Sequence, residues 1–246
     1  NFLISLSMQC FLNEYIYGKS KDEIEKIKKI DERIKNNLKE NKKISDLEIL
    51  CLSCYEPLTN FSWSSKIEFS DKLKEIFELQ IKNNEIEDQI SKSIKSISKV
   101  EDWVSIKVKK QYEENPYPRW VNLGLSIEPR NIREVVNDSG LNLDLKIIKN
   151  SENPEILIAG CGTGQHALTT ASKYKKSKVL ALDLSFKSLS YAKRKANELN
   201  INNIDFIQGN ILDLKSIDRK FDIIESVGVL HHMDNPFKGW KILTSC

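Results

Sequence analysis

The residues best suited to chemistry form a glycine-rich loop, Gly160-Cys161-Gly162-Thr163-Gly164, directly after a short apolar run. Glycine permits tight turns and lets a ligand approach the main chain, where the free N–H groups of a helix N-terminus can bind it. The loop therefore predicts a site for a nucleotide-like ligand. The dinucleotide-binding fingerprint requires glycine at the sixth position, which is Gln165 here, and a phosphate-binding P-loop requires a Gly-Lys-Ser/Thr that does not follow.

An acidic residue ends the next apolar run along the chain. Asp183 closes the segment KVLALD, and a carboxylate at the end of a second strand can accept hydrogen bonds from both hydroxyls of a ribose. The glycine loop alone is also compatible with a strand-to-helix turn that binds nothing. Together with Asp183, the loop favours a nucleoside ligand.

The elements that must position these residues alternate between strand and helix after Pro154. Apolar strands that alternate with helices are typical of a parallel sheet covered on both faces. We therefore expect an α/β domain over residues 154–246. The expected strands cover 155–159, 178–183, 204–208 and 221–226, and the expected helices cover 163–174, 186–199 and a segment that begins near Pro236.

The preceding part of the chain has the spacing of amphipathic helices. Ser20 and Glu23 form a capping box, and apolar residues recur at helical intervals from Ile24 to Leu38. We therefore expect residues 1–110 to be an all-helical region. Further helices are expected to begin near residue 2 and near residue 45 and to cover 71–81, 86–97, 100–114 and 129–137.

Composition excludes several classes of protein. The 38 basic and 35 acidic residues give a net charge of +3 without a polybasic surface, so a nucleic-acid partner is not expected. No apolar run reaches the roughly 20 residues that cross a bilayer, so no membrane association is expected, and the lack of a signal or lipid-attachment motif predicts a cytoplasmic location. The odd number of cysteines does not suit a disulfide framework. Cys51 and Cys54 have the spacing of a zinc pair, but no second pair completes four ligands, so no metal site is expected.

Four segments resemble the successive motifs of class I S-adenosylmethionine-dependent methyltransferases, in the same order. They are ILIAGCGTG (156–164), VLALDLS (179–185), IDFIQGNILDL (204–214) and FDIIESVGVLHHM (221–233). The segment QYEENPYPRW (111–120) and the helices before it further resemble bacterial members with an N-terminal tetratricopeptide-type helical region. The resemblance implies a Rossmann-like parallel sheet, S-adenosylmethionine as cofactor, and methyl transfer to an unidentified acceptor. The alternative is a non-catalytic nucleoside-binding protein with this fold, whose N-terminal helices dock a protein partner.

The resemblance also implies roles for individual residues. The glycine loop would contact the amino-acid part and the ribose of the cofactor, Asp183 would bind the ribose hydroxyls, and Leu184 would lie against the adenine. Asn210, at a position that is often acidic in the family, would accept a hydrogen bond from the adenine amino group through its carbonyl oxygen. Ser226 and Val227 would border the methionine portion. The cofactor-binding residues implied in this way are Gly160, Cys161, Gly162, Gly164, Asp183, Leu184, Asn210, Ile211, Ser226 and Val227.

Two features depart from the family pattern. Many members have Asp or Glu two residues before the first glycine, where this chain has Ile158. The ammonium of the methionine portion must then find acceptors elsewhere, such as the backbone carbonyls near Ala159 and Ser226. The family's sheet has seven strands, whereas this sequence predicts four. We therefore expect a C-terminally truncated domain in which the cofactor-binding half is present, and the activity of the fragment itself is open.

Methyl transfer from a sulfonium is an in-line displacement, so the protein chiefly aligns donor and acceptor, and a base is needed only for a protonated acceptor. His231 and His232, after the fourth predicted strand, are the nearest candidates for that base, and Glu225 is the next. The alternative is that one histidine packs at the start of a helix while the other faces solvent.

A proline-stiffened segment with aromatic and cationic residues precedes the α/β domain. It lies within a predicted linker over residues 111–153, and it carries Tyr112, Tyr117, Arg119 and Trp120. Such a segment can cover the mouth of a cofactor pocket and supply hydroxyl or guanidinium contacts. It can equally be interdomain packing with Trp120 as the anchor, and the sequence does not decide between the two.

Overall fold

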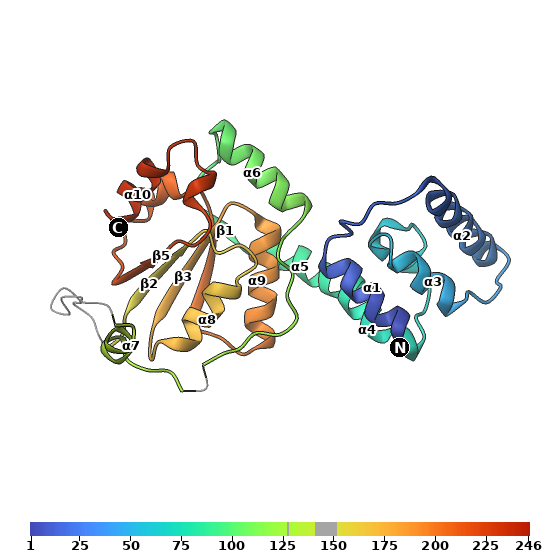
Figure 1. The fold of residues 1–246 in the computed structure, drawn as a ribbon, viewed down its shortest axis with the longest axis horizontal. Coiled ribbons are helices and arrows are strands. Elements are labelled where there is room, and N and C mark those ends of the chain that lie inside the picture. The colour runs from blue at the N-terminus through green and yellow to red at the C-terminus, as the bar shows by residue number, and fades with distance from the viewer. Residues whose placement is uncertain (127, 141–151) are drawn as a thin grey trace. The chain divides into compact units, whose positions relative to one another are not determined.

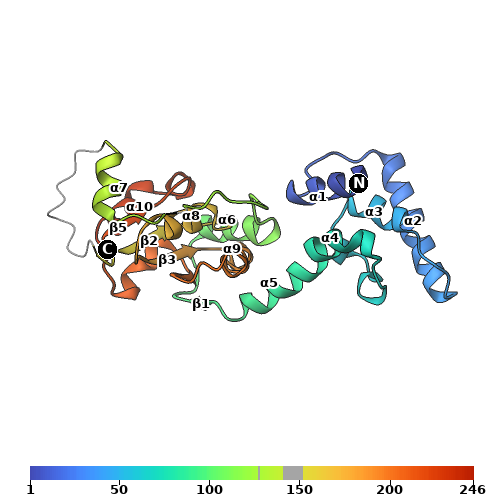
Figure 2. The same cartoon turned by 90° about the horizontal axis from the view of Figure 1, so that it is seen from below.

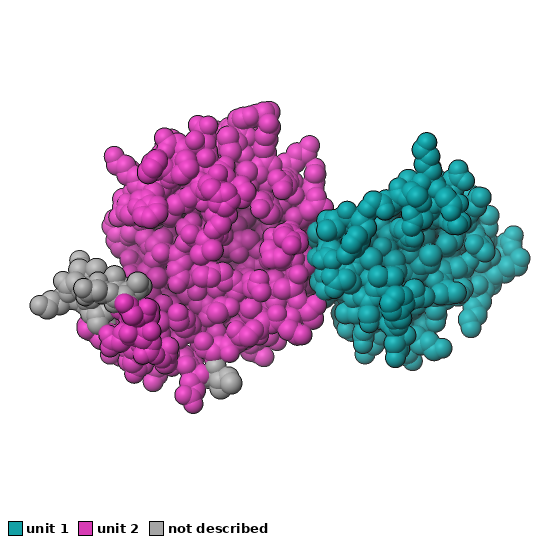
Figure 3. Space-filling model, viewed as in Figure 1, with its two compact units in different colours: residues 1–86 teal, residues 87–246 magenta. Residues whose placement is uncertain are grey.

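The computed structural model describes residues 1–126, 128–140 and 152–246. The chain divides into two compact units, residues 1–86 and 87–246, which Figure 3 shows in different colours. Each unit has a hydrophobic core of its own. Parts of the predicted linker, at residues 127 and 141–151, lie outside the described residues.

Every regular element of unit 1 is a helix. Ser20 Oγ accepts a hydrogen bond from Glu23 N, and Glu23 Oε2 accepts one from Ser20 N, so the predicted capping box starts the second helix. Ile34 of that helix is fully buried and packs in one cluster with Leu52. The helices are α1 (Phe2–Leu12), α2 (Lys21–Lys39), α3 (Asp46–Ser53) and α4 (Lys74–Phe77), which continues into a π-helical turn (Glu78–Lys82); α5 (Asn83–Ser91) extends into the second unit.

Unit 2 is built on a parallel sheet with the strand order β1-β4-β3-β2-β5 (Figure 1). The central strands are continuously apolar and buried, as a sheet covered on both faces requires. The predicted α/β fold with a parallel sheet is therefore confirmed. The strands are β1 (Lys95–Ser96), β2 (Glu155–Ala159), β3 (Lys178–Asp183), β4 (Ile204–Gln208) and β5 (Ile223–Glu225).

In the described part of the chain the sheet has five strands where four were expected, because the end of the helix predicted over 86–97 is a strand. The helix α5 ends at Ser91, and β1 pairs with β4 at the edge of the sheet. Ile94 and Ile97 are three residues apart, which suggests one helical face, but in an extended chain such residues point to opposite faces. In the structure Ile94 packs in the cluster on one side of the sheet and Ile97 against the cluster on the other.

The same clusters show which helices cover which face. On one face, β2 and β3 pack against α7 (Ile132–Asp138), α8 (Gln165–Lys173) and α9 (Phe186–Glu198). On the other face, they pack against the 3₁₀-helix Ile211–Ile217 and α10 (Pro236–Leu243). Figure 2 shows the same elements turned by 90°. A further helix of unit 2, α6 (Trp103–Glu114), lies next to α9, and a short 3₁₀-helix covers Leu230–His232. The residues of α6 up to 110 belong to the predicted all-helical region and the rest to the predicted linker, and the contacts of the structure group the whole helix with the sheet.

Because all strands are parallel, the loops that follow β2, β3, β4 and β5 meet at one edge of the sheet. The glycine loop, Asp183, Asn210 and Val227 are brought to this edge. Among the residues that the structure describes, no helix is both long and apolar enough to cross a membrane.

Candidate functional site

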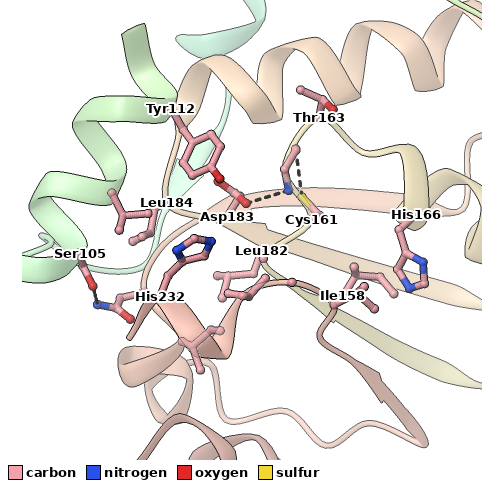
Figure 4. A pocket seen from close by; sticks show the side chains of 18 of the residues that line it. Ser105, Tyr112, Ile158, Cys161, Thr163, His166, Leu182, Asp183, Leu184 and His232 are labelled. Carbon is pink, nitrogen blue, oxygen red and sulfur yellow. Dashed lines mark hydrogen bonds between the residues drawn. The ribbon is translucent and has the colours of Figure 1, made fainter. Parts of the chain in front are cut away.

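A cavity of about 390 Å³ opens at the carboxyl edge of the sheet (Figure 4). This volume lies within the range of small-molecule sites in proteins. The glycine loop and the residues after β3, β4 and β5 form one part of its wall, and α6 with the segment that follows it forms the other. Of the residues predicted to bind a cofactor, the wall contains Gly160, Cys161, Gly162, Asp183, Leu184, Asn210, Ile211 and Val227.

The glycine loop needs its glycines for two different reasons. Gly160 and Gly164 have left-handed φ angles of +79° and +84°, and an added Cβ would lie 2.3 Å from Val229 Cγ2 and 2.5 Å from Ala192 Cβ respectively. Close packing therefore excludes side chains at both positions. Gly162, with φ +52°, has no atom within 4 Å of an added Cβ. It lines the cavity, so its main chain is open to a ligand.

Asp183 connects the loop with the end of β3. Its Oδ2 accepts a hydrogen bond from Gly162 N at 2.8 Å, and its Oδ1 accepts one from Ser185 N at 2.9 Å. Burial raises the pKa of Asp183, and the backbone N–H donors oppose that shift. Each carboxylate oxygen can accept a further hydrogen bond. The carboxylate therefore holds the turn through its backbone donors and borders the cavity with its remaining lone-pair capacity.

Asn210 has a structural role that the sequence did not predict. Its Nδ2 donates to Asp102 Oδ2 at 2.7 Å and to Ser105 Oγ at 2.9 Å, both at the start of α6. Its Oδ1 accepts from Leu212 N at 3.0 Å and so caps the following 3₁₀-helix. A hydrogen bond from an adenine amino group to Asn210 would therefore have to use the second lone pair of Asn210 Oδ1, because Leu212 N occupies the first.

Two predicted cofactor residues lie outside the cavity wall. Ser226 Oγ donates to Ala159 O at 3.0 Å, which engages the carbonyl that was expected to receive an ammonium group. Gly164 begins α8 as its N-terminal cap and packs on Ala192. Both residues contact other parts of the chain and do not line the cavity, whereas Val227 does.

The predicted bases differ in their positions. His232 lines the cavity, whereas His231 does not, although the two ring centroids are 4.1 Å apart. The third candidate, Glu225, is engaged in other contacts. Its Oε2 accepts from Thr170 Oγ1 at 2.7 Å and lies 2.8 Å from His166 Nε2. His232 is thus the predicted base that faces the site.

His166 is a wall residue that the sequence did not reveal. It stands in the first turn of α8, directly after the glycine loop, and its partner Glu225 lies on β5, far away in sequence. The pairing of β5 with β2 brings them together, because Glu225 on β5 is the partner of Ile158 on β2, and the chain runs from β2 through the glycine loop to His166. The hydrogen bond to Glu225 raises the pKa of His166. For Glu225, the contacts with His166 and Thr170 outweigh burial and lower the pKa.

Some residues of the segment from 112 to 120, hereafter the strap, line the cavity, and others pack against the rest of unit 2. Tyr112 and Tyr117 line the cavity, and Figure 4 shows the Tyr112 ring beside Asp183. Trp120 is buried, its Nε1 donates to Thr163 O at 3.1 Å, and its ring meets Tyr191 edge-on. The guanidinium of Arg119 also lies over the Tyr191 ring, at 5.8 Å, and not in the cavity wall.

Cysteine chemistry and metal binding have no support at this site. Cys161 is buried in the glycine loop, and burial raises the pKa of its thiol well above the ordinary value. A neutral thiol is a poor nucleophile and a poor metal ligand. Within the described ranges, no group of three or more His, Cys, Asp or Glu side chains is placed to hold a metal ion.

Part of the chain is similar in sequence to known proteins. Residues 156–241 match the family model of a methyltransferase domain. An uncharacterised protein of Synechococcus is 34% identical over 93 residues, which are 37% of this chain and 22% of that protein. Release factor glutamine methyltransferase of Flavobacterium psychrophilum is 38% identical over 79 residues, 32% of this chain and 27% of that enzyme. The solved structure of PKMT2 from Rickettsia typhi in complex with AdoHcy is 31% identical, with 46% of this chain and 21% of that chain covered and a TM-score of 0.37.

Residues 156–241 of unit 2 therefore match a methyltransferase domain, the class that the four motifs predicted. The cofactor of this class is S-adenosylmethionine. The chain spans less than a third of the length of each of the three proteins above. The tetratricopeptide-type character of the N-terminal helices and the truncation of the domain remain predictions.

Proposed function

We propose that the protein transfers a methyl group from S-adenosylmethionine to an acceptor. One observation carries this proposal. The half-buried carboxylate of Asp183, hydrogen-bonded to Gly162 N, lines a cavity of about 390 Å³ whose wall includes the open main chain of the glycine loop. A carboxylate beside exposed backbone suits a ribose and its 5′ substituent better than a phosphate, which the carboxylate would repel.

The residues present fit this cofactor. Asp183 would hold the ribose hydroxyls, and Leu184 and Ile211 supply apolar surface for the adenine. The loop at Gly160 and Gly162 would border the 5′ substituent, because an added side chain at Gly162 would enter open space there. The chemistry that the bound cofactor supplies is a methyl group on a positively charged sulfur.

The task of the chain is alignment more than proton transfer. Holding donor and acceptor in near-attack geometry removes much of the entropic barrier of a two-reactant step. Tyr112 and Tyr117 of the strap narrow the cavity on the side of α6 and would exclude water from it. His232 is the proposed base for an acceptor that must lose a proton, because its side chain faces the cavity and that of His231 does not.

Turnover is tested with S-adenosylmethionine labelled in the methyl group. The 246-residue chain is incubated with separated pools of proteins, lipids and small metabolites, and the labelled product and S-adenosylhomocysteine are quantified. We expect both to form in one pool at least. At subsaturating cofactor, Asp183→Asn should lower the rate by about 10-fold or more, because a hydrogen bond to a charged group contributes about 1.5–3 kcal/mol.

The matched control for this variant is Asp205→Asn on β4, whose side chain is exposed and away from the cavity. Its rate should equal that of the parent. Retention of bound cofactor without product in any pool, both by this chain and by a chain that carries the further strands expected from the resemblance, would contradict methyl transfer and favour the non-catalytic binding protein.

A further inference from the structure

The cavity has a charged pair at one of its sides that no step above uses. His166 Nε2 lies 2.8 Å from Glu225 Oε2, and Thr170 Oγ1 donates to the same carboxylate oxygen at 2.7 Å. Of the two charged residues, only His166 reaches the cavity wall. Within the part of the chain that the structure describes, Nδ1 of His166 has no hydrogen-bond partner. The imidazole is therefore fixed through one nitrogen and can donate to a ligand through the other.

The place of this pair in the cavity is defined by the other wall residues. Figure 4 shows Leu184 and Ser105 on one side, His166 and Ile158 on the opposite side, and Asp183 between them. A nucleoside whose ribose is held at Asp183, with its base toward Leu184, therefore extends its 5′ substituent toward His166.

Charge at this end of the cavity favours an anion. Ile158 supplies no charge, and Glu225 lies behind His166, so the group exposed to the ligand is the imidazole. His166 also stands in the first turn of α8, where the helix dipole adds positive potential. The hydrogen bond to Glu225 raises the pKa of His166, so the imidazolium persists to a higher pH than in an isolated histidine.

We propose that His166, oriented by Glu225, binds the α-carboxylate at the amino-acid end of the cofactor. This assignment rests on the proposed function. His166 is the binding residue and Glu225 is a positioning residue that acts through it. The pair thus provides a contact to the carboxylate of the amino-acid end, whereas Ile158, which has no polar atom on its side chain, provides no acceptor for its ammonium group.

The test compares two ligands that differ at this end of the molecule. S-adenosylhomocysteine carries the amino-acid group, whereas 5′-methylthioadenosine ends at the sulfur. Isothermal titration of the 246-residue chain should give tighter binding for the first ligand. His166→Gln should weaken S-adenosylhomocysteine about 10-fold, the lower range for a hydrogen bond between charged groups, and leave methylthioadenosine unchanged. Lys175→Gln, which removes an exposed positive charge just after α8, is the matched control and should alter neither affinity.

The pH dependence separates binding by an imidazolium from a merely structural role. The charged groups that act on His166 are Glu225 on β5 and Lys173 on α8. Since only the protonated imidazole is charged, the preference for S-adenosylhomocysteine should be full at about pH 5.5 and fall as the pH rises through the pKa of His166. Glu225→Gln removes the group that raises this pKa, so the fall should move to lower pH. In His166→Gln the preference should be independent of pH over the same range.

Three results would overturn the assignment. An equal loss for both ligands in His166→Gln would mean a general loss of structure. Unchanged binding of S-adenosylhomocysteine combined with a lower rate of turnover would place His166 on the acceptor side. A wild-type chain that binds both ligands equally well would show that no residue recognises the amino-acid end. If the folded wild-type chain binds neither ligand, the proposed function fails together with this inference.

Discussion

Asp183 has one structural role that is observed and one binding role that is proposed, and both depend on the same pair of oxygen atoms. By accepting from Gly162 N and Ser185 N, it fixes the glycine loop against the end of β3. In the proposed function, the remaining lone pairs would accept from the ribose of the cofactor. A substitution at Asp183 therefore changes the turn as well as the affinity, and the role of the ribose contact is measured more cleanly by changing the ligand.

Gly164 does not line the cavity, so a substitution there tests the packing of the glycine loop without changing the cavity wall. An added methyl group would lie 2.5 Å from Ala192 Cβ at a φ of +84°, so Gly164→Ala forces α8 and α9 apart and strains the backbone. We expect the free energy of unfolding of unit 2 to fall by about 2–4 kcal/mol, measured by urea denaturation.

The control is Gly124→Ala, because Gly124 has no atom within 4 Å of an added Cβ and no left-handed φ. Its free energy of unfolding should change by less than about 0.5 kcal/mol. Equal stability of the two variants would show that α8 and α9 are not packed as closely as the structure has them.

At the scale of elements, the strap is held to the glycine loop by side chains on both segments. Thr163 Oγ1 donates to Pro118 O at 2.6 Å, and Trp120 Nε1 donates to Thr163 O at 3.1 Å. Glu113, at the end of α6, accepts from Phe186 N at 2.8 Å and so caps α9. The segments on both sides of the cavity are therefore connected without any ligand.

Trp120 is the residue of the strap on which this connection depends most. It is 7% exposed, and Trp120→Ala removes its packing against Tyr191 and its hydrogen bond to Thr163. We expect unit 2 to lose about 3–5 kcal/mol of stability and the affinity for S-adenosylhomocysteine to fall, since Tyr117 and Pro118 leave the wall with the strap. Thermal denaturation and titration measure the two effects.

The matched substitution is Trp103→Ala on α6, where the indole is 68% exposed. It removes the same side chain from a solvated position and should cost less than about 1 kcal/mol. A similar loss at both tryptophans would contradict the anchoring of the strap by Trp120.

The strap and the edge strand also show which features could be predicted from sequence. The order of strands and helices after Pro154, the glycine loop and Asp183 are each encoded in short stretches of residues, so local patterns were sufficient. The strand β1 was missed because two isoleucines three residues apart fit a helix as well as a strand. His166 was missed because its partner Glu225 is brought to it only by the pairing of β5 with β2. Contacts of this kind depend on the whole sheet and leave no local signal.

At the scale of the whole molecule, the chain combines a helical unit and an α/β unit with separate cores. The cavity and every residue proposed to bind the cofactor belong to residues 87–246. The binding chemistry is therefore a property of the α/β unit. The N-terminal helices are free to serve a different purpose, for which docking of a protein partner remains a prediction.

The most direct test of this account is calorimetric titration of the folded 246-residue chain with S-adenosylhomocysteine and with its 2′,3′-dideoxy analogue. We expect one binding event for the first ligand and an affinity lower by about 10-fold or more for the second, because the analogue lacks both hydroxyls that Asp183 would accept from. The absence of binding heat at several temperatures, with a circular dichroism spectrum that shows native α/β structure, would contradict the account. Equal affinities would place the ribose away from Asp183.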